Sequence, residues 1–159
     1  MKIYVAGSMK NRDAIREVGE QLREHGFSCY VFCDAIEAAY AYSMQLRNQH
    51  DMSMLTPDLA LTLPVVQAIF ECNMRELEAS DVVLVVLPCG RSAHLEAGWA
   101  VGRGKVAMIY GPMVRGEFDA MYGMASGVFS VNEFDKLVLM LKKLEDFGAP
   151  HELYDQNLN

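Results

Sequence analysis

The residue of this chain best placed to do chemistry is a glutamate, Glu96, close to the start of an expected helix. If Ser92 is the N-cap of that helix, Glu96 lies about one turn inside it. The positive end of the helix dipole then favours the ionised carboxylate, by ~0.3–1 kcal/mol at an exposed site. The alternative interpretation is an ordinary first-turn glutamate that only complements the helix dipole.

The sequence around Glu96 is expected to form a strand, a turn that contains glycine, and a helix. Residues 81–87, DVVLVVL, are nearly all branched and apolar, which is typical of a strand buried on both faces in a parallel sheet. Residues 88–91 break that run, and Gly104 closes the following helix. Because open α/β sheets bind ligands at the carboxyl ends of their strands, Glu96 is expected to face a ligand.

A second turn, GSMKNR, follows the first expected strand and could bind an anion. A glycine after a strand lets a ligand approach the backbone, and amides at a helix N-terminus point outward. Lys10 and Arg12 add positive charge, although both could be no more than solvated surface residues. The turn is not a P-loop, because GxxxxGK[ST] does not occur in the sequence. The candidate ligand-binding residues here are Gly7, Ser8, Met9, Lys10, Asn11 and Arg12.

Five strands are expected to alternate with helices along the chain. Strands are predicted at residues 2–6, 27–33, 81–87, 105–110 and 127–131, and helices at 11–25, 35–49, 64–80, 92–104 and 133–147. Right-handed crossovers then give an α/β, Rossmann-like three-layer sandwich with a five-stranded parallel sheet. The flavodoxin-like order 2-1-3-4-5 places the first and third strands side by side, so the turns after them would share one crevice. Asn132 is expected to cap the last helix, and the apolar segment 50–64 could be a lid or a subunit contact.

Composition limits the class of protein. The 159 residues are 52% hydrophobic, which suits one domain over residues 1–150 with a polar tail at 151–159. The net charge of −7 argues against binding to a nucleic-acid polymer. No apolar run reaches the ~20 residues of a membrane span. Four cysteines without a CxxC pair favour a reduced, cytoplasmic protein with no metal site and no cofactor.

Three segments, KIYVAGS, CNMRELEASDVVLVVLP and LEAGWAVGRGK, resemble the nucleoside 2-deoxyribosyltransferase family and its relatives, the 2'-deoxynucleoside 5'-monophosphate N-glycosidases. The likeness covers roughly residues 2–145 as an order of elements, and it implies a single domain of this kind over residues 1–150. The third segment is the most specific, because the glutamate, the glycine and the following GK keep their spacing.

The resemblance implies catalytic roles for three residues. Glu96 would attack C1' of the sugar through an oxocarbenium-like transition state and form a glycosyl-enzyme. Tyr4 matches the tyrosine that orients this glutamate, although aromatic residues also simply favour strands. Asn73 stands where the family usually has an aspartate that protonates or positions the leaving base. Asparagine can donate and accept hydrogen bonds but cannot be a general acid.

Residues Gly90, Arg91, Ser92 and His94 complete the expected substrate site. Gly90 replaces a base-contacting aspartate of many transferases, so the proton for the base would come from His94, Asp58 or water, or the substrate differs. His94 is a candidate acid near neutral pH, or a residue at the helix start that faces solvent.

The monophosphate glycosidases have a phosphate turn similar to GSMKNR, which favours a nucleoside 5'-monophosphate as the substrate. In these relatives a loop of a neighbouring subunit closes the site. Asp119, Met121 and Tyr122 lie in the comparable place, which implies a homodimer or a higher homo-oligomer.

The leading hypothesis is an N-glycosidase that cleaves the base from a nucleoside or deoxynucleoside 5'-monophosphate. Base exchange between nucleosides and an inactive nucleotide-binding module are the alternatives; the missing aspartates at positions 73 and 90 favour the latter. Pro88, Gly90 and Glu96 also share the spacing of the PGGxGTxxE motif of LOG-type nucleotide phosphoribohydrolases, but Ser92-Ala93 replaces Gly-Thr. A receiver domain is disfavoured, because its acidic pocket should follow the first strand.

Overall fold

The computed structural model describes residues 1–34, 56–116 and 119–147. The helix expected at 35–49 and the tail at 151–159 lie outside the described residues. The described part contains a single five-stranded sheet, all of whose neighbouring strands are parallel, in the order β2-β1-β3-β4-β5. The strands are β1 (Lys2–Ala6), β2 (Ser28–Val31), β3 (Val82–Val86), β4 (Val106–Gly111) and β5 (Gly127–Ser130). The predicted α/β Rossmann-like fold and its strand order are therefore confirmed.

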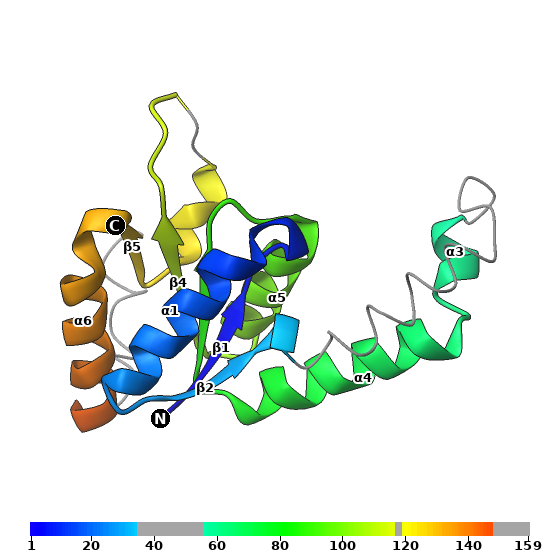
Figure 1. Cartoon of the computed structure of the whole chain (residues 1–159), viewed down its shortest axis with the longest axis horizontal. Coiled ribbons are helices and arrows are strands. Elements are labelled where there is room, and N and C mark those ends of the chain that lie inside the picture. Colours follow the sequence, from blue (N-terminus) through cyan, green and yellow to red (C-terminus); the bar gives the residue numbers. More distant parts are fainter. Residues whose placement is uncertain (35–55, 117–118, 148–159) are drawn as a thin grey trace.

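Helices cover both faces of this sheet (Figure 1). The longer helices are α1 (Arg12–Glu24), α4 (Pro64–Ala79), α5 (Arg91–Gly102) and α6 (Phe134–Phe147). Short helices are η1 (Met9–Asn11), α3 (Pro57–Ala60), η3 (Ala120–Met124) and η4 (Val131–Glu133). Helices α1 and α6 lie on one face and α5 on the other, while α4 runs outward from the sheet and carries α3 at its far end (Figure 1).

Strand register decides which side chains face α5. Tyr4 of β1 lies opposite Tyr30 of β2 and Val83 of β3, and Val83 lies opposite Ala107 of β4. Successive side chains of a strand point to opposite faces, so these four share one face. Ile3 and its register partners on β2 and β3 lie on the other face, toward α1 and α6. All five residues of β3 are buried, as expected for the central strand of a parallel sheet.

Two predicted helix caps were wrong. Helix α5 begins at Arg91 with Gly90 as its N-cap, because Gly90 takes the extended backbone of a cap (φ −105°, ψ −175°); Ser92 lies in the first turn. Before α6, Ser130 rather than Asn132 is the capping residue. Ser130 and Glu133 form a reciprocal capping box at the start of η4, which leads into α6.

Two other segments also differ from expectation. The second strand ends at Val31, because residues 32–34 are already helical instead of continuing the strand. Within the apolar segment 50–64, for which no helix was predicted, the described part includes the short helix α3, which begins at Pro57. Proline suits the first helical position, because its missing N–H has no partner there anyway.

Candidate active site

Two strands and two helices bring four polar side chains together on the α5 face. The Tyr4 hydroxyl of β1 donates to Oε1 of Glu96 on α5 across 3.0 Å. The Tyr30 hydroxyl of β2 donates to Oδ1 of Asn73 on α4 across 3.1 Å. The two tyrosine rings pack with their centroids 5.1 Å apart and tilted by 32°. The structure therefore joins Glu96, Tyr4 and Asn73, which the sequence singled out, and adds Tyr30, which it did not.

The Glu96 carboxyl is less acidic than the helix dipole alone would make it. Burial raises its pKa to about 7, and the hydrogen bond from Tyr4 acts in the opposite direction. This effect of burial outweighs the ~0.3–1 kcal/mol available from the helix dipole. The expected ionised carboxylate is therefore replaced by one that is partly protonated at neutral pH. Glu96 still keeps some contact with solvent.

Tyr4 is a permanent hydrogen-bond donor to this carboxyl. Its side chain is fully buried, and burial together with the Glu96 charge raises the phenol pKa far above its ordinary value. The phenol therefore stays protonated over the whole range in which Glu96 titrates.

The turns after β1 and β3 are adjacent, as predicted. Ala6 and Val85 are register partners at the ends of the two strands. The Asn11 side-chain amide crosses between the turns and donates to the Leu87 carbonyl at 3.1 Å and more weakly to the Pro88 carbonyl at 3.5 Å. This side chain therefore ties one turn to the other, which leaves it less free for a ligand than expected.

Gly7 is required by packing at this point. A Cβ atom on Gly7 would lie 2.4 Å from Cδ1 of Ile15 and 3.3 Å from the carbonyl oxygen of Val86. The contact of 2.4 Å is shorter than real Cβ contacts, so a larger residue would have to displace the Ile15 side chain, which packs α1 against the sheet. The glycine that the sequence marked as a point of ligand approach thus also serves the contact between α1 and the sheet.

The remaining residues of the GSMKNR turn are arranged around a short 3₁₀ helix. The Ser8 hydroxyl accepts from the Lys10 backbone N–H at 3.3 Å and caps this helix. Met9 packs against the core, and the exposed Arg12 pairs with Asp13 at 3.6 Å. Lys10 is also exposed to solvent and lies within the turn that was expected to bind an anion.

His94 lies on the opposite side of α5 from Glu96. Its ring contacts the Gly90 carbonyl oxygen at 3.0 Å, the Tyr122 hydroxyl at 3.3 Å and Sγ of Cys89 at 3.6 Å. Residues two apart on a helix project about 200° from each other, so the His94 and Glu96 side chains point to different sides of α5.

Two cavities flank the stacked rings of His94 and Tyr122. One, of about 540 Å³, is floored by Ala107 and Ile109 of β4 and closed by Met121 of η3. The other, of about 660 Å³, lies beyond Cys89 and the β3–α5 turn. Asp119, Met121 and Tyr122, expected to reach a neighbouring subunit, thus lie over α5 of their own chain, where Met121 is 60% exposed. The exposed Arg91 and Ser92 lie at the start of the same helix.

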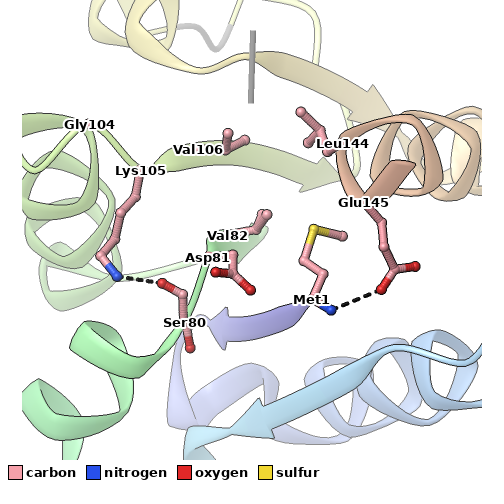
Figure 2. Close-up of a pocket in the computed structure, with 9 residues that line it drawn as sticks. All are labelled: Met1, Ser80, Asp81, Val82, Gly104, Lys105, Val106, Leu144 and Glu145. Carbon is pink, nitrogen blue, oxygen red and sulfur yellow. Dashed lines mark hydrogen bonds and ion pairs between the residues drawn. The ribbon is translucent and has the colours of Figure 1, made fainter. Parts of the chain in front are cut away.

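A further cavity, of about 410 Å³, lies at the other end of the sheet (Figure 2). It is lined by the first residues of β3 and β4, Val82 and Val106, and is bounded by two polar contacts. The Met1 amino group pairs with Glu145 at 2.9 Å, and Lys105 donates to the Ser80 carbonyl oxygen. Ligands of open α/β sheets bind at the carboxyl ends of strands, so this cavity is the less favourable place for a substrate.

The sequence does not single out Tyr30, because tyrosine is common in strands. In the structure, the parallel register of the first two strands and the alternation of side chains place Tyr30 on the same face as Tyr4.

Comparison with known proteins adds a fold relationship. No family model matches the sequence, and no curated protein matches it significantly. The structure is similar to that of the CMP N-glycosidase BcmB of Clostridium botulinum, with a TM-score of 0.50 and 15% sequence identity. The alignment covers 90% of this chain and 98% of that one. At this identity the two chains share the fold, over nearly the whole length of each.

In the described part of the chain, no helix is both long enough and apolar enough to cross a membrane. No group of three or more histidine, cysteine, aspartate or glutamate side chains there is arranged to hold a metal ion.

Proposed function

We propose that this protein is an N-glycosidase that cleaves the bond between base and sugar in a nucleoside or deoxynucleoside 5'-monophosphate, with Glu96 as the nucleophile. The observation that carries the proposal is the hydrogen bond from Tyr4, in the middle of β1, to Glu96 on α5, the helix that follows the central strand β3. A partly buried carboxyl whose pKa is near 7 suits a nucleophile that must be ionised to react but is not strongly solvated.

The reaction runs in two steps. The ionised Glu96 attacks C1' of the sugar, the C1'–N bond breaks, and its electron pair stays on the base. Water then attacks C1' of the glycosyl-enzyme, and the bond to Glu96 breaks to restore the carboxylate. Tyr4 holds Oε1 of Glu96 in place, which leaves the other carboxylate oxygen for the attack.

The substrate's phosphate would lie at the turn formed by residues 7–12. This turn abuts the β3–α5 turn through Asn11, and Lys10 there is exposed to solvent. The structural similarity to a CMP N-glycosidase supports a nucleotide as the class of substrate. The proposed assembly is a homodimer or a higher homo-oligomer in which the exposed Met121 and its neighbours approach the other subunit.

The experiment is a turnover panel. Purified protein is incubated with ribonucleosides, deoxyribonucleosides and their 5'-monophosphates, and free base is measured by chromatography. We expect release from at least one monophosphate, loss of release in Glu96→Gln, and no change in Glu20→Gln, which alters an exposed carboxylate on α1. No release from any compound, or full activity in Glu96→Gln, contradicts the proposal.

A second free base in the reaction separates hydrolysis from base exchange. If a new nucleoside forms faster than free sugar or sugar phosphate, the enzyme is a transferase. If nucleotide binds tightly without any turnover, the chain is a binding module.

A further inference from the structure

Tyr30 connects the β2 strand to the α4 residue that replaces the family's aspartate. Its hydroxyl has one proton, and that proton is donated to Oδ1 of Asn73 at 3.1 Å. The same hydroxyl lies 3.7 Å from Sγ of Cys72, the preceding residue of α4. Tyr30 therefore holds the middle of α4 through two neighbouring side chains, of which only Asn73 offers a strong acceptor.

The hydrogen bond from Tyr30 fixes which side of the Asn73 amide faces Tyr30. An amide side chain has one acceptor oxygen and two N–H donors. Tyr30 occupies the oxygen, while no hydrogen bond from Nδ2 of Asn73 to another described residue accompanies it. The NH₂ group is therefore the part of Asn73 that is available to a ligand.

Tyr30 also belongs to the environment of Glu96. Its ring packs on that of Tyr4, the residue that binds Glu96. Burial raises the pKa of the Tyr30 phenol, and its contact with Cys72 and the more distant charge of Glu96 raise it further, so the phenol stays protonated near neutral pH. The Tyr30–Asn73 pair and the Tyr4–Glu96 pair thus lie at two sides of one site.

Resting on the function proposed above, we propose that Tyr30 is a positioning residue that fixes the Asn73 amide with its NH₂ group toward the substrate, where it donates a hydrogen bond to the acceptor atom beside the glycosidic nitrogen of the leaving base. That atom is a carbonyl oxygen in a pyrimidine and a ring nitrogen in a purine. When the C1'–N bond breaks, its electron pair spreads onto this acceptor, and the amide stabilises the added charge without giving up a proton. The proton that neutralises the base comes from water.

The test compares four variants in the turnover assay. Tyr30→Phe should lower kcat about tenfold with little change in KM, since the lost orientation matters most as charge develops. Asn73→Ala should lower it by at least as much, and the double variant should be no worse than Asn73→Ala alone, because Tyr30 acts through Asn73. Cys72→Ala removes the other contact of the same hydroxyl and should leave kcat unchanged. Additive losses in the double variant overturn the proposal.

Asn73→Asp separates donation from simple packing. Aspartate keeps the acceptor for Tyr30 and nearly the same shape, but when ionised it has no donor. The rate of this variant relative to wild type should therefore fall toward that of Asn73→Ala as the pH is raised from 5 to 9. A ratio of the two rates that does not change over this range overturns the proposal.

A measurement without substrate keeps this inference distinct from the proposed function. The side-chain NH₂ signals of Asn73 in a ¹⁵N–¹H spectrum are assigned by their loss in Asn73→Ala. They should shift in Tyr30→Phe and stay in place in Cys72→Ala. Signals that do not move in Tyr30→Phe overturn the positioning role, whereas absence of turnover in the wild type overturns the proposed function instead.

Discussion

The Tyr4 hydroxyl lies 3.0 Å from Oε1 of Glu96, although the two residues are 92 positions apart in the sequence. This bond opposes the effect of burial on the same carboxyl, which raises its pKa to about 7. The balance between the two determines at which pH Glu96 can act as a nucleophile, and it leads to the first three predictions.

Base release should depend on pH with a midpoint near 7. The reactive form of Glu96 is the carboxylate, so kcat/KM should fall about tenfold per pH unit below the pKa and reach a plateau above it. The measurement is kcat/KM between pH 5 and 9 on the best substrate of the panel. A rate that is constant down to pH 5 would show that Glu96 ionises at its ordinary pKa.

Glu96→Gln should stabilise the fold at alkaline pH. Glu96 has a higher pKa in the folded chain than in the unfolded one, so the folded state holds the extra proton between about pH 4.5 and 7. Stability is therefore lost as pH rises through this window, by up to about 3 kcal/mol. Urea unfolding of both proteins at pH 5 and pH 8 measures the difference, which should grow toward pH 8. Equal differences at the two pH values contradict the raised pKa.

Tyr4→Phe should shift the midpoint of the pH profile of kcat/KM to higher pH. The variant keeps the ring that packs on Tyr30 but loses the donor that lowers the Glu96 pKa. We expect a midpoint above 7 and a kcat reduced about tenfold, as for the loss of a hydrogen bond to a charged group. Circular dichroism checks that the fold is kept. An unshifted midpoint would mean that Tyr4 does not influence the ionisation of Glu96.

His94→Ala should keep most of the activity. The His94 ring contacts Tyr122 and the Gly90 carbonyl on the far side of α5 from Glu96. A general acid would contribute about 10²–10⁴-fold, whereas we expect less than about a threefold loss in kcat/KM at pH 7. A loss of a hundredfold or more would restore His94 as the acid.

Gly7→Ala should destabilise the protein by about 1–3 kcal/mol, because the new Cβ meets Ile15 and the Val86 carbonyl. Adding Ile15→Val removes the Cδ1 atom at 2.4 Å, so the double variant should lose less than the sum of the two single ones. Gly98→Ala is the matched control. Its Cβ would meet nothing within 4 Å inside α5, and alanine should gain roughly 0.5–1 kcal/mol there. Thermal or urea unfolding measures all four, and a neutral Gly7→Ala contradicts the packing argument.

The strand order could be predicted from sequence because its determinants are local. The buried run of β3, residues 82–86, and the helical spacing of Ile15, Val18 and Leu22 in α1 each fix an element and its buried side. Handedness of the crossovers then leaves few ways to order the strands. The adjacency of the turns after β1 and β3 follows directly from that order.

The ionisation of Glu96 and the contacts of Tyr30 could not be predicted in the same way. Position along a helix suggested an ionised Glu96, but the packing around it, which sequence does not give, sets the pKa. The contact of Tyr30 with Asn73 depends on how α4 leans on the edge strand β2, a tertiary detail with no local pattern. For His94 the sequence left two interpretations open, and a spacing of two residues on a helix already indicates that its side chain and that of Glu96 point to different sides of α5.

Because the Asn11 amide spans from one turn to the carbonyls of Leu87 and Pro88, the lengths of the two turns are not independent. An inserted residue in either one would move a donor and its acceptors out of reach of each other. Loop grafting intended to alter substrate preference in this protein would therefore have to exchange both turns together.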